Sequence, residues 1–225
     1  MSRYYPILLE LKGKRVLVVG GGKVAQRKIE ALLEHEAFVN VVAKELSGPV
    51  ASLVEKGLIH YAGQDFSESH LDKIFMVIAA TSDVSLNRHV SEKAQQKGLL
   101  VNAVDQPSEC NFIVPSVLRR GDLVLAVSTS GKSPAFARKV REDLEAHFGG
   151  EYESFLALMG HLRELVFSQG FSQEQNKALF EKLIASPLLL SIRDKDWERA
   201  ASIVSDVFGR PFSREEIVSY AREGK

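Results

Sequence analysis

The chain reads Arg15-Val16-Leu17-Val18-Val19-Gly20-Gly21-Gly22-Lys23-Val24-Ala25 near its start. The apolar run before the glycines predicts a buried β-strand, and an amphipathic helical pattern follows them. In this context Gly20 permits a tight turn, Gly22 lets a pyrophosphate approach the backbone, and Ala25 lets the helix pack closely on the sheet. The stretch therefore predicts the first strand, turn and helix of a dinucleotide-binding fold.

The first two thirds of the chain repeat this alternation of short β-branched runs and amphipathic helical stretches. We expect strands at residues 15–20, 38–43, 76–81, 99–105 and 123–128. Apolar residues at helical spacing run from Ala25 to Leu33 and from Leu86 to Ala94, where Gly98 follows as a C-cap. This alternation is typical of an α/β fold, with a parallel sheet of Rossmann type covered by helices on both faces.

The last third of the chain loses the β pattern. A helix is predicted to begin with Ser133 as N-cap and Pro134 in its first turn. After residue 150 four helical segments follow, and residues 151–225 are expected to form a helical C-terminal domain. Two of those helices open with capping-box patterns, Ser172 with Gln175 and Ser213 with Glu216.

The composition restricts the classes of protein. The 225 residues include 29 lysines and arginines and 29 aspartates and glutamates, so no global charge would attract nucleic acid or an anionic membrane. No stretch approaches the roughly 20 apolar residues that span a bilayer, and residues 1–6 carry no apolar signal segment. The chain is therefore expected to be neither exported nor embedded in a membrane.

The cysteine and histidine contents bear on compartment and metal binding. Cys110 is the only cysteine, which excludes an internal disulfide and a four-thiolate zinc site and fits a cytoplasmic protein. The six histidines show no paired ligand spacing, so no permanently bound metal is expected. Cys110 itself is interpreted as a small hydrophobic residue.

The end of the second predicted strand bears on the choice of nicotinamide cofactor. An acidic residue at this point usually binds the adenosine ribose, but here the strand runs through Ala43 into Lys44 and Glu45. Glu45 can reach the ribose, which favours NAD, whereas Lys44 would favour the 2′-phosphate of NADP. Spacing alone leaves both cofactors open.

Residues 126–133 end like a second phosphate-binding motif, but Ala126 stands where its first glycine belongs. The preceding strand leaves too short a loop to wrap phosphates, and Pro134 removes an N–H from the helix start, so we reject that interpretation. Two alternatives remain, a well-capped helix or a site for substrate carboxylates. The carboxylate site would use Ser128, Thr129, Ser130, Gly131 and Lys132.

Asp105 is the candidate catalytic residue. It follows a predicted strand and so lies at the carboxyl end of the sheet, where open α/β sheets bind ligands. A long loop follows it, and such loops often carry function. A carboxylate there can accept a proton, although an aspartate after a strand is also a common turn or cap residue.

Several motifs follow one another in order over about residues 1–148. They are Pro6-Ile7 with Leu11, the glycine turn with Arg27-Lys28, Ile78-Ala79-Ala80-Thr81, Asn102-Ala103-Val104-Asp105, Phe112-Ile113-x-Pro115-Ser116, and Ser130-Gly131-Lys132-Ser133-Pro134-x-x-Ala137-Arg138. Taken together, these motifs resemble those of the precorrin-2 dehydrogenase / sirohydrochlorin ferrochelatase family.

The resemblance implies an architecture and a reaction. Residues 1–112 would form an NAD-binding Rossmann domain, residues 113–150 a dimerisation and substrate-cleft segment, and residues 151–225 a helical domain of open role. The implied reaction is the NAD-dependent oxidation of precorrin-2 to sirohydrochlorin by a homodimer, on the way to siroheme. Some members also insert iron, with Fe²⁺ as a substrate, and the sequence does not decide this.

The resemblance also assigns roles to individual residues. Asp105 would be essential for dehydrogenation and, where present, for metal insertion. Thr81 would border the nicotinamide, and residues 128–133 would line the tetrapyrrole cleft, with Lys132 and Arg138 meeting the substrate carboxylates. The implied NAD contacts are Gly20, Gly22, Lys23, Val24, Lys44 and Glu45.

Two other hypotheses about the function compete with precorrin-2 oxidation. Lys44 suggests an NADP-linked reductase of another small substrate, which a cofactor-preference assay would separate. The other reading is a non-enzymatic module that senses NAD and signals through its helical part. That reading leaves Asp105 and the segment around Lys132 without a role.

Overall fold

The computed structural model describes residues 4–168 and 172–222, so the first three residues of the N-terminal stretch considered above lie outside the described residues. The chain forms two compact units, residues 1–114 and residues 115–225. The finer boundary at residue 150 stays a prediction. In the described part of the chain no helix is both long and apolar enough to cross a membrane.

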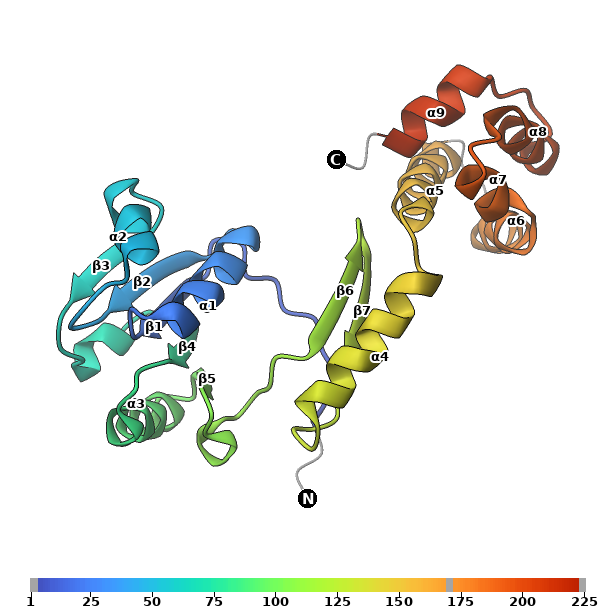
Figure 1. The fold of residues 1–225 in the computed structure, drawn as a ribbon. Coiled ribbons are helices and arrows are strands. Elements are labelled where there is room, and N and C mark those ends of the chain that lie inside the picture. The colour runs from blue at the N-terminus through green and yellow to red at the C-terminus, as the bar shows by residue number, and fades with distance from the viewer. Residues whose placement is uncertain (1–3, 169–171, 223–225) are drawn as a thin grey trace. The chain divides into compact units, whose positions relative to one another are not determined.

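The first unit is a five-stranded parallel sheet, drawn in blue to green in Figure 1, with the strand order β3-β2-β1-β4-β5. Four of its strands match predicted ones, although each ends earlier than expected. Residues 48–63, for which no element was predicted, form a short helix and the edge strand. The strands are β1 (Arg15–Val19), β2 (Phe38–Val42), β3 (His60–Gly63), β4 (Met76–Ala79) and β5 (Leu100–Ala103).

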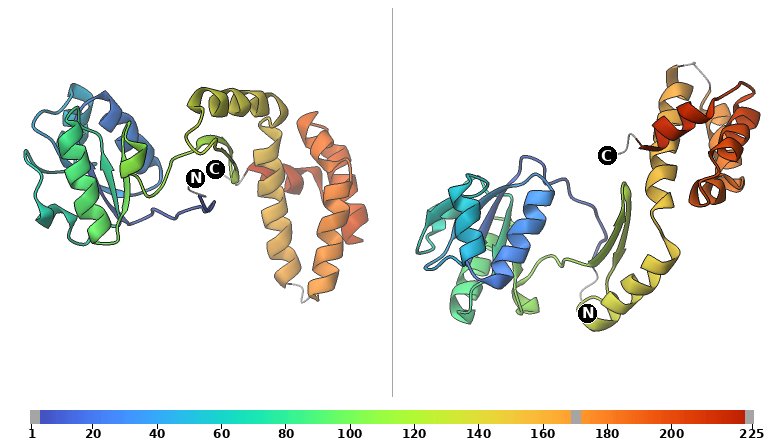
Figure 2. Two further views of the ribbon diagram at one scale, coloured as in Figure 1. Left: turned by 90° about the horizontal axis from the view of Figure 1, so that it is seen from below. Right: turned by 45° about the horizontal axis from the view of Figure 1, so that its top comes forward.

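Helices cover both faces of this sheet, as the alternation of the sequence predicts (Figures 1 and 2). On one face α1 (Lys23–Glu34) and α2 (Gly48–Glu55) pack through Ala25, Ile29 and Val50 against Val16 and Val18. On the other face α3 (Val84–Gln96) packs through Val90 and Ala94. The 3₁₀ turns η1 (Glu68–Leu71) and η2 (Pro107–Glu109) lie in the connecting loops.

The fifth predicted strand is real but does not belong to this sheet. β7 (Leu123–Val127) lies in the second unit and pairs antiparallel with β6 (Ser116–Arg120). Gly121, with a φ of 55°, and Asp122 form the turn between them. A two-residue turn can only join antiparallel strands, because a parallel pair needs a crossover of a dozen residues or more.

The second unit is otherwise helical. α4 (Pro134–His147) begins as predicted, with Ser133 as its N-cap and a proline in the first turn, and packs beside the β6–β7 hairpin. The helices that follow share one apolar core, in which Leu158, Leu162, Leu183 and Ile217 are buried. Those helices are α5 (Glu151–Ser168), α6 (Gln173–Ala185), α7 (Leu188–Arg193), α8 (Trp197–Phe208) and α9 (Arg214–Arg222).

The described residues after position 150 therefore contain five helices, where the sequence predicted four. The predicted capping boxes are confirmed. The Ser172 N–H donates to Gln175 Oε1 at 2.9 Å, and the Ser213 N–H donates to Glu216 Oε2 at 2.7 Å. The separate short helix α7, which starts directly after Pro187, accounts for the difference.

Candidate active site

A groove of about 1160 Å³ opens at the carboxyl end of the parallel sheet. Loops that follow all five strands contribute to its lining, as expected for the ligand-binding edge of an open α/β sheet. The groove contains every predicted cofactor contact together with the candidate catalytic residue. These residues are Gly20, Gly22, Lys23, Val24, Lys44, Glu45, Thr81 and Asp105.

The three glycines of the turn after β1 have different roles. A Cβ on Gly20, whose φ is 126°, would collide with the carbonyl oxygen of Ala80, and a Cβ on Gly21 would collide with that of Glu45. These two glycines let the loops after β4 and β2 pack against the turn. A Cβ on Gly22 would meet nothing within 4 Å. The absent side chain of Gly22 therefore leaves open space above the backbone.

The N-terminus of α1 borders that open space. Gly22 is its N-cap, and no side chain caps the first turn. The first N–H groups of a helix have no partner within the helix, and together with the helix dipole they favour a bound anion. The uncapped turn and the open space at Gly22 therefore fit a pyrophosphate.

The loop after β2 forms the side of the groove expected to hold the adenosine. Lys44 and Glu45 are both exposed there. The Ser47 N–H donates to the Gly21 carbonyl at 2.8 Å, which fixes this loop to the glycine turn. The buried Ser47 Oγ has no hydrogen-bond partner among the described residues, so it remains available to a ligand in the groove.

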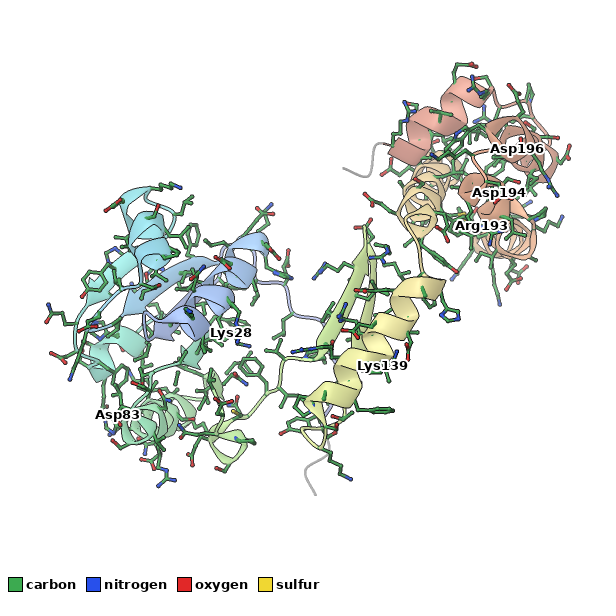
Figure 3. All side chains as sticks on the ribbon, in the orientation of Figure 1. Lys28, Asp83, Lys139, Arg193, Asp194 and Asp196 are labelled. Carbon is green, nitrogen blue, oxygen red and sulfur yellow. The ribbon has the colours of Figure 1, made fainter. Side chains whose placement is uncertain are left out.

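Asp83, at the start of α3 (Figure 3), caps that helix beside the groove. Its carboxylate accepts hydrogen bonds from the Ser85 hydroxyl at 2.6 Å and from the Leu86 N–H at 3.0 Å. These bonds hold the pKa of Asp83 below its ordinary value, and the positive charge of Lys44 lowers that pKa further. These bonds engage the Asp83 carboxylate at the start of α3.

Thr81 lines the groove as predicted, but its side chain is engaged within the protein. Its hydroxyl lies 2.7 Å from Asn87 Oδ1, and the Asp83 N–H donates to that hydroxyl at 3.1 Å. The hydroxyl thus shapes the turn that follows β4. Any contact of Thr81 with a cofactor would therefore come from other atoms of the turn.

Asp105 presents a free carboxylate at the same edge. It is exposed and makes no hydrogen bond or ion pair with the described residues. Its backbone φ is 59°, a left-handed conformation that aspartate tolerates better than most residues and that often marks a functional position. The next residue, Gln106, also lines the groove, and its buried Oε1 has no partner among the described residues.

The predicted substrate residues lie in the second unit. There the hydroxyls of the loop before α4 serve the backbone: Ser128 Oγ accepts the Ser130 N–H, and Thr129 Oγ1 accepts the Ser133 N–H, both at 3.0 Å. Lys132 is exposed, with no ion pair among the described residues. Gly131 and Arg138 are exposed as well.

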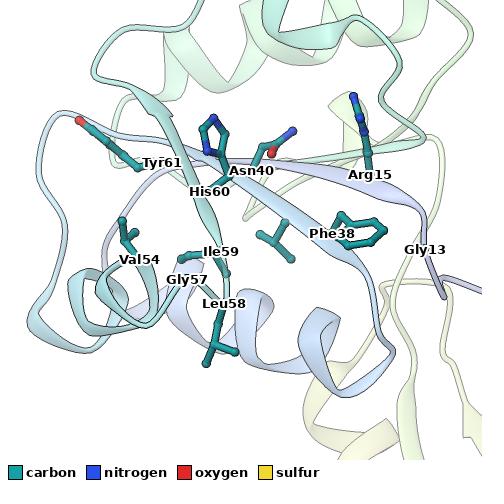
Figure 4. A pocket seen from close by; sticks show the side chains of 11 residues that line it. Gly13, Arg15, Phe38, Asn40, Val54, Gly57, Leu58, Ile59, His60 and Tyr61 are labelled. Atoms are coloured by element: carbon teal, nitrogen blue, oxygen red, sulfur yellow. The ribbon is translucent and has the colours of Figure 1, made fainter.

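A second cavity, of about 1010 Å³, lies beside the edge strand β3 and the first residues of β1 and β2 (Figure 4). Its lining includes Arg15, Phe38 and His60, each of which is the first residue of its strand. This cavity is therefore distinct from the groove at the carboxyl ends. Within the described residues, no three His, Cys, Asp or Glu side chains form a cluster that could hold a metal ion.

Sequence reasoning missed four polar residues that the structure places at or behind the groove. Ser47, Asp83 and Gln106 line it, and Asn87 supports Thr81 from beneath. Two of them had a detectable signal. Asp83 precedes a helical pattern, as an N-cap does, and Asn87 interrupts an apolar helix face.

The groove and the sheet define a dinucleotide-binding α/β protein, and two family models match the chain. One, described as putative NAD(P)-binding, covers residues 7–116, and the other, described as sirohaem biosynthesis protein central, covers residues 120–147. With the similar proteins below, they show that the chain belongs to the precorrin-2 dehydrogenase / sirohydrochlorin ferrochelatase family, as its motifs indicated.

Curated relatives include siroheme synthase 1 of Serratia proteamaculans, 48% identical over 64% of this chain and 30% of the relative. Siroheme synthase 1 of Yersinia enterocolitica is 37% identical over 99% of this chain and 44% of the relative. The chain thus spans less than half the length of these relatives. A solved structure named SirC, precorrin-2 dehydrogenase, matches with a TM-score of 0.78 and 29% identity, over 92% of this chain and 100% of the other.

Proposed function

We propose that this protein oxidises precorrin-2 to sirohydrochlorin with NAD as the hydride acceptor. One observation carries the proposal: the open glycine turn and the free carboxylate of Asp105 line the same groove. The likeness to a solved precorrin-2 dehydrogenase over nearly the whole chain supports the choice of substrate.

The chain's own residues have separable tasks in this proposal. Gly22 and the uncapped start of α1 hold the pyrophosphate, and the loop with Glu45 and Ser47 holds the adenosine ribose. NAD, when bound, supplies a hydride acceptor. Oxidation of precorrin-2 also releases one proton, and the Asp105 carboxylate, which has no partner among the described residues, accepts it.

We favour NAD over NADP because Glu45 stands next to Lys44 in the loop that borders the groove. Both side chains are exposed and line the groove, so the positive charge of Lys44 lies beside a carboxylate. Glu45 meanwhile offers an acceptor for a ribose hydroxyl and would repel a 2′-phosphate. Fluorescence titration should give a lower Kd for NADH than for NADPH, and tighter binding of NADPH would contradict this assignment.

The substrate is proposed to meet the second unit through the segment of residues 128–133. Precorrin-2 is a polycarboxylate, so it needs local positive charge on a protein whose formal net charge is zero. Lys132 and Arg138 supply that charge, and the exposed edges of Ser128, Ser130 and Gly131 supply polar contacts, with Thr129 supporting the loop.

We also propose a cytoplasmic homodimer. The β6–β7 hairpin packs against α4, and among the described residues its two strands pair only with each other, which leaves both outer edges for a second copy. The free thiol of Cys110 is compatible with a reducing compartment. Sedimentation of the purified protein should give a dimer, and a monomer at micromolar concentration would contradict the assembly.

The test of the main proposal is anaerobic turnover of precorrin-2 with NAD, measured through NADH and sirohydrochlorin absorbance. Asp105→Asn should lower kcat about a hundredfold or more and leave the Kd of NADH within about twofold. Asp206→Asn, an exposed aspartate on α8, is the matched control. If the protein binds NAD but does not oxidise precorrin-2, a sensing module becomes the better reading.

Repeating the assay with Fe²⁺ tests a second activity, insertion of iron into sirohydrochlorin. The free Asp105 carboxylate favours it, because metal insertion releases pyrrole protons that need an acceptor. Iron-dependent loss of sirohydrochlorin absorbance, absent in Asp105→Asn, is the expected result. Unchanged sirohydrochlorin in the presence of Fe²⁺ would limit the protein to dehydrogenation.

A further inference from the structure

Helix α3 carries a line of polar side chains on the face that packs toward the sheet edge. Asn87, Ser91 and Gln95 follow one another at four-residue spacing, so they lie along one side of the helix. Asn87 is 2% exposed and Ser91 is 0% exposed. Buried polar groups destabilise a fold unless they are hydrogen-bonded, so their partners indicate what they are for.

Asn87 bonds to the turn that follows β4. Its Oδ1 accepts the Thr81 N–H at 3.1 Å and the Thr81 hydroxyl at 2.7 Å, and its Nδ2 donates to the Thr81 carbonyl at 3.0 Å. One side chain thereby holds the backbone N–H, the carbonyl and the hydroxyl of a single residue. Since Thr81, Ser82 and Asp83 all line the groove, Asn87 sets the shape of one of its walls from behind.

Ser91 and Gln95 bond to a different loop, the one that follows Asp105. The Ser91 hydroxyl donates to the Glu109 carbonyl, and Gln95 Nε2 donates to the same carbonyl at 3.2 Å. That carbonyl ends η2, which starts two residues after Asp105. The adjacent Cys110 thiol completes the loop, with its Sγ 3.3 Å from the Gln106 carbonyl oxygen.

We propose that α3 is a positioning helix with two separable functions. Asn87 positions the turn of residues 81–83 for the nicotinamide cofactor, and Ser91, assisted by Gln95, positions the loop that orients Asp105. These are positioning residues, because they act through Thr81 and Glu109. The part that concerns Asp105 rests on the proposed dehydrogenase function, whereas the part that concerns cofactor binding does not.

The first test compares Asn87→Ala with Ser91→Ala. Asn87→Ala should raise the Kd of NADH about tenfold and leave kcat at saturating NAD within about twofold, because only the cofactor turn is released. Ser91→Ala should lower kcat about tenfold and leave that Kd within about twofold. Ser91→Thr, which keeps the hydroxyl, should recover most of the rate.

A double-mutant cycle tests whether Asn87 acts through Thr81. Thr81→Val removes the hydroxyl that Asn87 accepts, so the combined effect of Thr81→Val and Asn87→Ala on the Kd of NADH should be smaller than the product of the single effects. Strictly multiplicative effects would overturn the assignment of Asn87 as a positioning residue for this turn.

Cys110 provides a readout of the loop that is independent of activity. It is the only cysteine in the chain, and burial raises the pKa of its thiol, so iodoacetamide should modify it slowly in the wild-type protein. Ser91→Ala should raise this rate about fivefold, because the loop opens more often, and Asn87→Ala should leave it unchanged.

Gln95→Ala is the second variant, for the case that loss of the buried Ser91 hydroxyl prevents folding. Gln95 is exposed, so its removal should preserve the fold and raise the Cys110 rate about twofold without changing NADH affinity. Its neighbour Gln96 is the matched control, since its side chain has no bond to any described residue.

The outcomes separate the two proposals. If wild-type protein does not oxidise precorrin-2, the proposed function fails, while NADH affinity and the Cys110 rate still decide the roles of Asn87 and Ser91. The alternative is that Asn87→Ala and Ser91→Ala have similar effects on NADH affinity, similar effects on the Cys110 rate and similar effects on thermal stability. In that case α3 has only a structural role. That result would overturn the positioning proposal.

Discussion

Two turns of this molecule look alike in sequence and differ in what their helix N-termini offer. Both follow a strand, contain glycine and lysine, and lead into a helix. At the start of α1 the N-cap is Gly22, without a capping side chain. At the start of α4 the Ser133 hydroxyl accepts the Phe136 N–H at 3.2 Å, and Thr129 Oγ1 accepts the Ser133 N–H.

This difference in capping decides which helix start keeps backbone N–H donors for an anion. Where the protein's own hydroxyls satisfy the first N–H groups, the helix start is stabilised but has fewer donors left for a ligand. Where no side chain does so, the donors remain for a phosphate. The segment of residues 128–133 should therefore bind anions through Lys132 more than through its helix N-terminus.

The largest expected effect on NADH affinity comes from substituting one glycine in each of the two turns. Gly22→Ala places a methyl group in open space, so the fold should be unchanged while the Kd of NADH rises about tenfold or more. Gly131→Ala introduces a side chain at a φ of 81°, which should destabilise the protein by about 1 kcal/mol without changing NADH affinity. Titration and thermal melts measure both. Equal NADH affinities for the two variants would remove the distinction.

The next effect concerns Lys132. Lys132→Met removes an exposed charge with no ion-pair partner among the described residues, so the KM for precorrin-2 should rise about fivefold while NADH affinity stays constant. Lys139→Met is the matched control. That lysine, on α4 (Figure 3), is already paired with Asp143 at 2.5 Å. A similar rise in KM for both variants would argue against a specific role of Lys132.

A smaller effect concerns the cap of α4. Ser133→Ala removes the acceptor of the Phe136 N–H and should reduce the free energy of unfolding by about 1 kcal/mol. NADH affinity should not change, because the groove that fits the dinucleotide lies in the first unit. Denaturant unfolding measures the stability. If the variant has the same free energy of unfolding as the wild-type protein, this cap contributes no stability. The starts of α1 and α4 would then not differ in energy through capping.

The smallest effect is the pH dependence at the cap of α3. The pKa of Asp83 is lowered in the folded protein, so its stabilising contribution is complete above the ordinary value near 3.8 and is lost as the pH falls below that value. Asp83→Asn keeps a capping oxygen but does not titrate, so its stability should fall less steeply below pH 4. Acid unfolding curves of the two proteins should therefore converge, and parallel curves would contradict the assignment.

Much of the first unit could be predicted from residues near one another in sequence. The glycine turn, four strands and two crossover helices follow from alternation and helical spacing, which are local properties. The edge strand His60–Gly63 was missed because it is short and only partly buried, so it contains no apolar run that would predict a strand. The partners of Leu123–Val127 were also missed, since a strand's sequence does not specify what it pairs with.

The candidate site likewise combines features set by neighbouring residues with features set by long-range packing. The sequence by itself determined the glycine turn, the position of Lys44 and Glu45 after the second strand, and Asp105 at a strand end, because a motif and the position of a strand depend on consecutive residues. Only the tertiary structure decided that these residues share one groove and that Asn87 and Ser91 hold its loops. Those contacts join residues up to 18 positions apart through the packing of α3, and local patterns carry no information about them.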